Sequence, residues 1–185
     1  MRLLKFLLLL IALIFLFASC KELEAFTYNE YTSLLMRIRE LFSLCSVLLG
    51  QSDTFVGDMF SRLYYGYYNI GRLIFSNIYG YDYPSHNQVW KKMNEPIKFF
   101  GFTMKSIREK YEYYPLSPND IQRQSKEDIK VVLSENKFNE MILELRNTLL
   151  YCEKYSKEEK EVLFNEIKLL ELEHEKFLRE LKKKP

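Results

Sequence analysis

Residues 64–84 read YYGYYNIGRLIFSNIYGYDYP, and this stretch decides the fold. Together with the residues just before it, it carries apolar side chains at spacings of three and four, which share one face of a helix: Phe60, Leu63, Tyr67, Ile70 and Ile74. Gly66 and Gly71 weaken the helix only locally and would let a neighbouring helix approach closely. The stretch therefore predicts a long helix that carries more tyrosines than one buried face can hold.

The surplus tyrosines are open to two interpretations. In the first, which we favour, the helix is central and buried on several sides, so that the tyrosine rings are buried in the core. In the second, a protein-contact or membrane-contact surface forms around residues 64–83, because tyrosine combines a large contact area with a polar tip. The candidate contact residues are Tyr64, Tyr65, Tyr68, Tyr79, Tyr81 and Tyr83. The same two interpretations apply to Tyr111, Tyr113 and Tyr114.

Helical spacing continues outward on both sides of this stretch. It predicts helices over residues 28–49, from Ser52 or Asp53 to Tyr79, and over about 85–111, 135–154 and 157–183. Three pairs of residues have the spacing of a capping box at a helix start: Thr27 with Glu30, Ser85 with Gln88, and Ser156 with Glu159.

Two segments interrupt this pattern. Pro96 lies inside the third predicted helix, and because proline lacks a backbone donor we expect a kink or a restart near Asn94–Glu95. Residues 115–125 contain two prolines and polar side chains and predict a loop, with a short helix after Ser125.

No segment shows the alternating pattern of a strand. The connections between the predicted helices are mostly short, which favours antiparallel neighbours. The sequence therefore predicts an all-α fold, an antiparallel helical bundle of about five helices that covers residues 28–185.

The N-terminus has the layout of an export signal. Residues 1–20 read MRLLKFLLLLIALIFLFASC, with Arg2 and Lys5 before an unbroken apolar run from Leu7 to Phe17. This run is shorter than the roughly 20 residues that a membrane-spanning helix needs. A cleaved signal is therefore favoured over a permanent transmembrane segment.

The end of this segment, Phe17-Ala18-Ser19-Cys20, resembles a bacterial lipobox, where a peptidase cuts before a lipid-modified cysteine. The usual pattern has Leu, Val or Ile where this chain has Phe17. This departure resembles the looser lipoboxes of spirochaetes. The resemblance implies a signal peptide over 1–19, a lipidated Cys20 with a short tether over 20–27, and acyl chains that hold the domain at a membrane. The alternatives are an ordinary secretory signal and an uncleaved anchor.

Charge argues against nucleic-acid binding. The chain has 27 Lys+Arg and 25 Asp+Glu, and the excess, Arg2 and Lys5, belongs to the signal. The mature chain is therefore neutral, whereas a nucleic-acid binder usually shows a basic excess on one face.

Few residues suggest chemistry. Cys45 and Cys152 are candidates for a disulfide in an oxidising compartment, with two unpaired buried thiols as the alternative. Glu171 and His174 have the spacing of half a di-iron site, but the other half is missing, so we expect His174 to close an apolar helix stripe. Phosphate-loop and nucleophile-elbow motifs are absent from the sequence. We therefore expect no cofactor, no metal and no enzymatic activity.

The lipobox, the short tether and the small helical body together resemble the small all-helical surface lipoproteins of spirochaetes, especially Borrelia-like ones. Cys20-Lys21-Glu22 is also similar to surface-export signals of Bacteroidota lipoproteins. The resemblance implies display at the outer membrane or cell surface and non-enzymatic binding of a protein, which includes host molecules. A structural or assembly role in the periplasm and a tethered enzyme are the alternatives.

Overall fold

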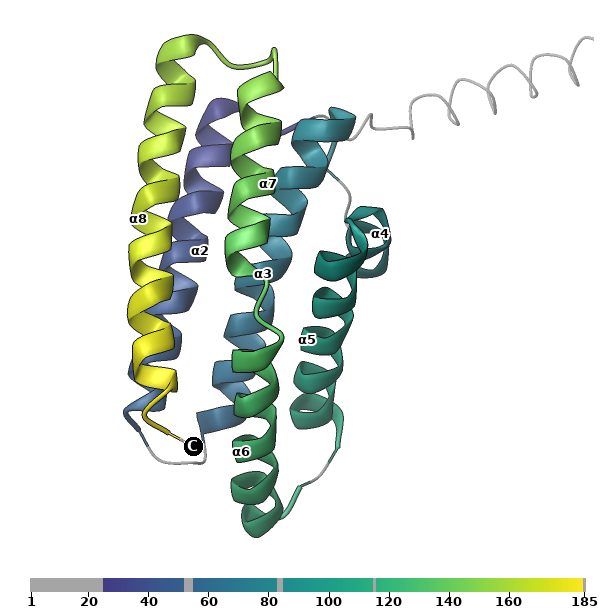
Figure 1. Cartoon of the computed structure of the whole chain (residues 1–185), viewed down its shortest axis with the longest axis vertical. Coiled ribbons are helices and arrows are strands. Elements are labelled where there is room, and N and C mark those ends of the chain that lie inside the picture. Colours follow the sequence, from purple (N-terminus) through teal and green to yellow (C-terminus); the bar gives the residue numbers. More distant parts are fainter. Residues whose placement is uncertain (1–24, 52–54, 83–84, 115, 185) are drawn as a thin grey trace, which may run out of the picture.

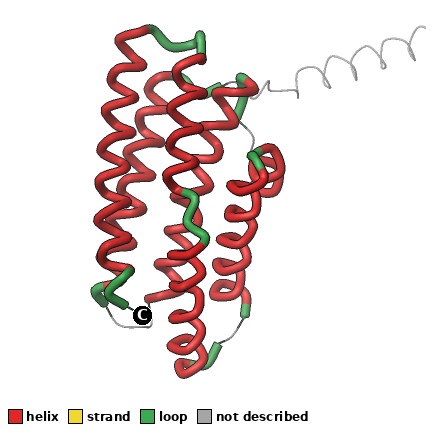
Figure 2. Tube along the Cα trace, viewed as in Figure 1, coloured by secondary structure: helices red, strands yellow, loops and turns green. Residues whose placement is uncertain are grey.

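The computed structural model describes residues 25–51, 55–82, 85–114 and 116–184. Within these ranges the chain consists of helices and loops without a strand (Figure 2). The predicted all-α class is confirmed. The helices are α2 (Tyr28–Leu49), α3 (Val56–Tyr79), α4 (His86–Lys92), α5 (Glu95–Tyr113), α6 (Pro118–Ser134), α7 (Phe138–Tyr151) and α8 (Lys157–Leu181). The predicted signal peptide, Cys20 and Tyr83 lie outside the described residues.

The helices form five rods that alternate in direction along the chain (Figure 1). The rods are α2, α3, α4 with α5, α6 followed by α7, and α8. The first and last rods are parallel neighbours: Tyr31 near the start of α2 contacts Tyr155 just before α8, with ring centroids 5.4 Å apart, and Phe42 farther along α2 contacts Phe177 near the end of α8 at 6.3 Å. Seven described helices thus occupy the place of the five that were predicted.

Helix α3 is the centre of the bundle, because α2, α4, α5 and α7 all pack against it. Its buried residues lie on several faces, and they include Tyr64, Tyr67 and Tyr68 as well as Gly66 and Gly71. A Cβ atom at Gly66 would come within 3.0 Å of Phe42, and one at Gly71 within 3.0 Å of Val89. The glycines therefore allow the close approach that was expected of them, and the first interpretation of the tyrosines holds for these three.

Most predicted helix ends are confirmed. Thr27 with Glu30 and Ser156 with Glu159 form complete capping boxes. The restart near Asn94–Glu95 is confirmed as well, because the Asn94 side chain accepts a hydrogen bond from the Ile97 amide and Pro96 lies in the first turn of α5. The third predicted capping box is wrong, since Ser85 precedes α4 without a side-chain cap.

The predicted loop over 115–125 is also wrong, because α6 begins at Pro118. Ser117 accepts a hydrogen bond from the Asp120 amide, and proline fits the first turn of a helix, where its missing donor has no partner to lose. Farther along α6, the buried Asp128 accepts hydrogen bonds from Lys110 at 2.7 Å and Tyr111 at 2.9 Å, which holds α6 against α5.

Gly101 in α5 tests the packing between α5 and α4, the two helices of the third rod. A Cβ atom there would come within 2.2 Å of Trp90 Cδ2, on the buried ring of α4. Helix propensity alone would make Gly101→Ala stabilising by up to about 1 kcal/mol. We expect a loss of about 2 kcal/mol in the free energy of unfolding instead, because the ring has to move inside a packed core.

Urea unfolding of the two chains measures this difference. Ser106→Ala, at an exposed position of the same helix, is the control and should change the free energy by less than about 0.5 kcal/mol. An unfolding free energy for Gly101→Ala equal to or above that of the wild type would contradict the packing.

Candidate functional site

The six tyrosines of the predicted contact surface lie in different environments. Tyr64 and Tyr68 are buried, so their assignment to a contact surface is wrong. The reason is that α4 and α5 cover the side of α3 that a simple amphipathic helix would expose to solvent. Tyr65 and Tyr81 are partly buried, Tyr79 is exposed, and Tyr83 lies outside the described residues.

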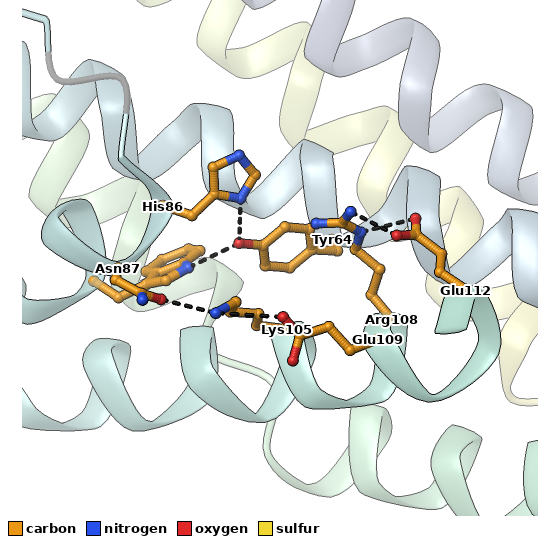
Figure 3. A network of polar contacts seen from close by, with 8 residues as sticks. Tyr64, His86, Asn87, Lys105, Arg108, Glu109 and Glu112 are labelled. Atoms are coloured by element: carbon orange, nitrogen blue, oxygen red, sulfur yellow. Dashed lines mark hydrogen bonds and ion pairs between the residues drawn. The ribbon is translucent and has the colours of Figure 1, made fainter. Parts of the chain in front are cut away.

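Tyr64 belongs to an aromatic cluster around His86 on α4 (Figure 3). The His86 ring stacks on Tyr68 with centroids 3.9 Å apart, and its Nδ1 lies 2.7 Å from the Tyr64 hydroxyl. Trp90 Nε1 donates to the same hydroxyl at 3.4 Å. The Tyr64 hydroxyl therefore joins α3 to both His86 and Trp90 of α4.

Cations border this cluster. The Arg108 guanidinium lies 5.3 Å from the centroid of the Tyr64 ring and 4.9 Å from that of Tyr65, and Glu112 holds it through a 2.5 Å hydrogen bond. Burial first, and then the charges of Arg108 and Lys105, lower the pKa of His86. Burial raises the pKa of Tyr64 well above its ordinary value. Both groups are therefore neutral at pH 7, and their hydrogen bond pins α4 to α3.

The second histidine lies inside the bundle. His174 is buried on α8, as the helix stripe predicted. Its ring stacks on Phe138 with centroids 3.5 Å apart, and its Nε2 lies 2.9 Å from the Tyr67 hydroxyl, which also accepts from Asn136. Burial lowers the pKa of His174 to about 3. The side chain is thus a neutral ring in the core, hydrogen-bonded to Tyr67.

Glu171 does not join His174, because it forms an ion pair with Arg146 at 2.5 Å. Among the residues that the structure describes, no group of three or more His, Cys, Asp or Glu side chains is placed to hold a metal ion.

Of the two interpretations of Cys45 and Cys152, the disulfide is wrong, because both thiols are free. Cys45 is buried near the end of α2, with its sulfur 3.5 Å from the Met59 carbonyl oxygen. Cys152 is three residues before Tyr155, whose ring contacts Tyr31 near the start of α2. Tyr31 and Cys45 are 14 positions apart, which corresponds to about 21 Å along a helix. A disulfide requires Cα atoms within about 7 Å. Each cysteine continues the three-and-four spacing of apolar residues in its predicted helix, which indicates that it faces inward. That spacing does not show that the two cysteines lie at opposite ends of the bundle.

The first described residues are held to the bundle by a set of contacts that we call the clasp. Tyr155 donates to the Phe26 carbonyl oxygen at 2.6 Å, and Lys154 donates to the carbonyl oxygen of Ala25. The Phe26 amide donates to Ser76 Oγ at 3.4 Å, and the Arg72 guanidinium lies 5.2 Å from the centre of the Phe26 ring. The clasp fixes where the chain enters the bundle.

Sequence reasoning missed the clasp because most of its acceptors are backbone carbonyls. Such contacts leave no spacing pattern in the sequence. The only available signal was the position of Lys154 and Tyr155 just before a predicted helix start. Short connections between the helices would bring this turn back towards the beginning of the first helix.

Comparisons with protein-family models, with curated proteins and with solved structures found no match for this chain. No residue role is therefore carried over from a relative. In the part of the chain that the structure describes, none of the helices is both long enough and apolar enough to span a membrane.

The burial of His174 predicts a pH-dependent stability. The unfolded chain binds a proton below the ordinary histidine pKa of about 6.5, while the folded chain resists protonation down to about 3. The stabilising contribution is therefore complete above pH 6.5 and is lost as the pH falls. The free energy of unfolding should decrease by about 2 kcal/mol between pH 7 and pH 5 from this group alone.

Urea unfolding at pH 5, 6 and 7 measures this effect, with His174→Gln as the matched variant. The glutamine amide can still form a hydrogen bond with Tyr67 but does not titrate, so its pH profile should be flatter than that of the wild type by that amount. Parallel profiles would show that His174 is accessible to protons in the folded chain.

Proposed function

We propose that this chain is a bacterial lipoprotein, anchored by acyl chains on Cys20 and displayed at the outer membrane or cell surface, where its helical domain binds another protein without catalysing a reaction. The observation that carries the proposal is the order of features in residues 1–20: Arg2 and Lys5, an apolar run, small residues and then Cys20. The proposal extends the resemblance to small helical lipoproteins of spirochaetes.

The clasp supports this proposal, because it gives the tether a fixed attachment point on the domain. Five peptide steps separate Cys20 from Ala25, and they span at most about 18 Å. A domain attached this closely has a restricted orientation on the membrane. Such a restriction keeps the same face of the domain turned away from the membrane.

The exposed aromatic side chains of α5 support protein binding. α5 is an edge helix that packs on α3 and α4, and its outward Phe99 and Tyr113 are 63% and 67% exposed. Aromatic residues are enriched in protein interfaces because they bury a large area with few rotatable bonds. Of the tyrosines considered from the sequence, Tyr113 thus takes the place of the buried Tyr64 and Tyr68.

The anchor and its location are tested in cells of the bacterium that encodes the chain. Metabolic labelling with an alkyne analogue of palmitate should mark the wild-type chain but not Cys20→Ser. Protease added to intact cells should then degrade the wild-type chain. An unlabelled wild-type chain would overturn the lipid anchor, and a labelled but protected chain would place the domain in the periplasm.

Partner binding is tested by a photo-crosslinking amino acid at position 99 of the full chain. We expect a discrete protein adduct on illuminated cells. The matched control is position 172 on α8, where Leu172 is 60% exposed and thus similar in exposure to Phe99. Adducts of equal yield at both positions, or none at position 99, would contradict a contact surface on α5.

A further inference from the structure

Four large apolar side chains are exposed at the end of the bundle that holds the clasp. Ile78 and Tyr79 end α3 and are 48% and 40% exposed, while Leu150 and Tyr151 end α7 and are 55% and 81% exposed. A shallow groove of about 430 Å³ is lined by both Ile78 and Tyr151. The two pairs therefore border one surface, which we call the tether end.

The tether end lies close to the start of the described chain. Tyr155, which binds Phe26, is four residues beyond Tyr151, and Ser76, which accepts from the Phe26 amide, is two residues before Ile78. Figure 1 shows the upper ends of α2, α3, α7 and α8 at one end of the bundle, and the last residues of α8 at the other. The exposed apolar residues and the attachment point of the tether thus occupy the same end.

The tether length brings this end to the lipid. If acyl chains hold Cys20 at the membrane surface, Ala25 lies within about 18 Å of it. That distance is less than two helix diameters, since one helix with its side chains measures about 10–12 Å across. Side chains within a helical turn or two of the clasp can therefore reach the headgroup layer.

The chemistry of the tether end suits that layer. Tyrosine is favoured at membrane interfaces because its ring is apolar and its hydroxyl is polar. Lys92 Nζ lies 5.7 Å from the centre of the Tyr79 ring, and Lys160 donates to the Leu150 carbonyl oxygen at 3.0 Å. Lysines beside apolar residues can keep their charge in water while their stems contact lipid.

Charge is balanced in the turn before α8 and in its first residues. The turn and first residues of α8 carry Lys154, Lys157 and Lys160 together with an equal number of acids, Glu153, Glu158 and Glu159. A contact made by this surface depends on apolar burial and not on attraction to anionic lipid. It should therefore be as strong on zwitterionic as on anionic membranes.

We infer that the tether end of the bundle contacts a phospholipid surface through Ile78, Tyr79, Leu150 and Tyr151, so that the domain stands on the membrane with this end buried in the headgroup layer. The inference rests on the proposed acylation of Cys20. It assigns Tyr79 to the membrane contact, while the exposed surface of α5 stays accessible to a protein partner.

The test uses the full chain, purified from the bacterium that encodes it and reconstituted into phosphatidylcholine vesicles that contain spin-labelled lipid. Tyr151→Trp carries the probe at the tether end. Tyr113→Trp is the matched control, because Tyr113 is exposed to a similar degree at the end of α5 and far from the clasp. Wild-type chain supplies the background of the buried Trp90. Mass spectrometry of the same samples establishes whether Cys20 carries acyl chains.

We expect spin-labelled lipid to quench the probe at position 151 at least about twofold more than the probe at position 113, independently of protein density on the vesicle and of added phosphatidylglycerol. Acylated chain with equal quenching at both positions would overturn the inference and leave the proposed anchor intact. A spectral change that appears only at high protein density would show that a second copy covers this end, and would also overturn it. Chain without acyl groups would overturn the proposed function and the inference together.

Discussion

A buried tyrosine hydroxyl needs a hydrogen-bond partner, because burial without one costs about 1–3 kcal/mol. This bundle meets that requirement across its helices. Asn77 of α3 donates to Tyr31 of α2, Tyr64 of α3 pairs with His86 of α4, and Tyr67 of α3 pairs with His174 of α8. Among the described side chains, no buried nitrogen or oxygen lacks a partner. Apolar packing alone tolerates sliding, whereas a hydroxyl requires its partner within about 3 Å, so these pairs fix the register of the rods.

Much of the fold could be predicted because local rules act at the positions concerned. Spacing located the helices, side-chain oxygens at Thr27 and Ser156 located two helix starts, and Pro96 located the restart of α5. The start of α6 was missed because proline both breaks a helix and begins one. Which role Pro118 takes depends on the Ser117 cap before it.

The environment of the tyrosines could not be predicted from α3 alone. Whether Tyr64 faces solvent depends on α4, a short helix that follows a turn and carries His86, Val89 and Trp90 to the same side of α3. The spacing of residues 64–84 shows how many rings have to be placed, but it contains no information on which neighbouring helix covers them. The same reasoning applies to Cys45 and Cys152, whose stripes indicate burial and not height along the bundle.

The number of rods gives the domain a lengthwise polarity. An even number of alternating rods would bring both ends of the described chain to the same end of the bundle. Five rods carry the end of α8 to the side opposite the clasp, about 37 Å away along a helix of 25 residues. A peptide or reporter fused behind α8 would therefore project from the pole farthest from the anchor, which makes this end of the bundle a suitable place to attach a cargo without disturbing the clasp.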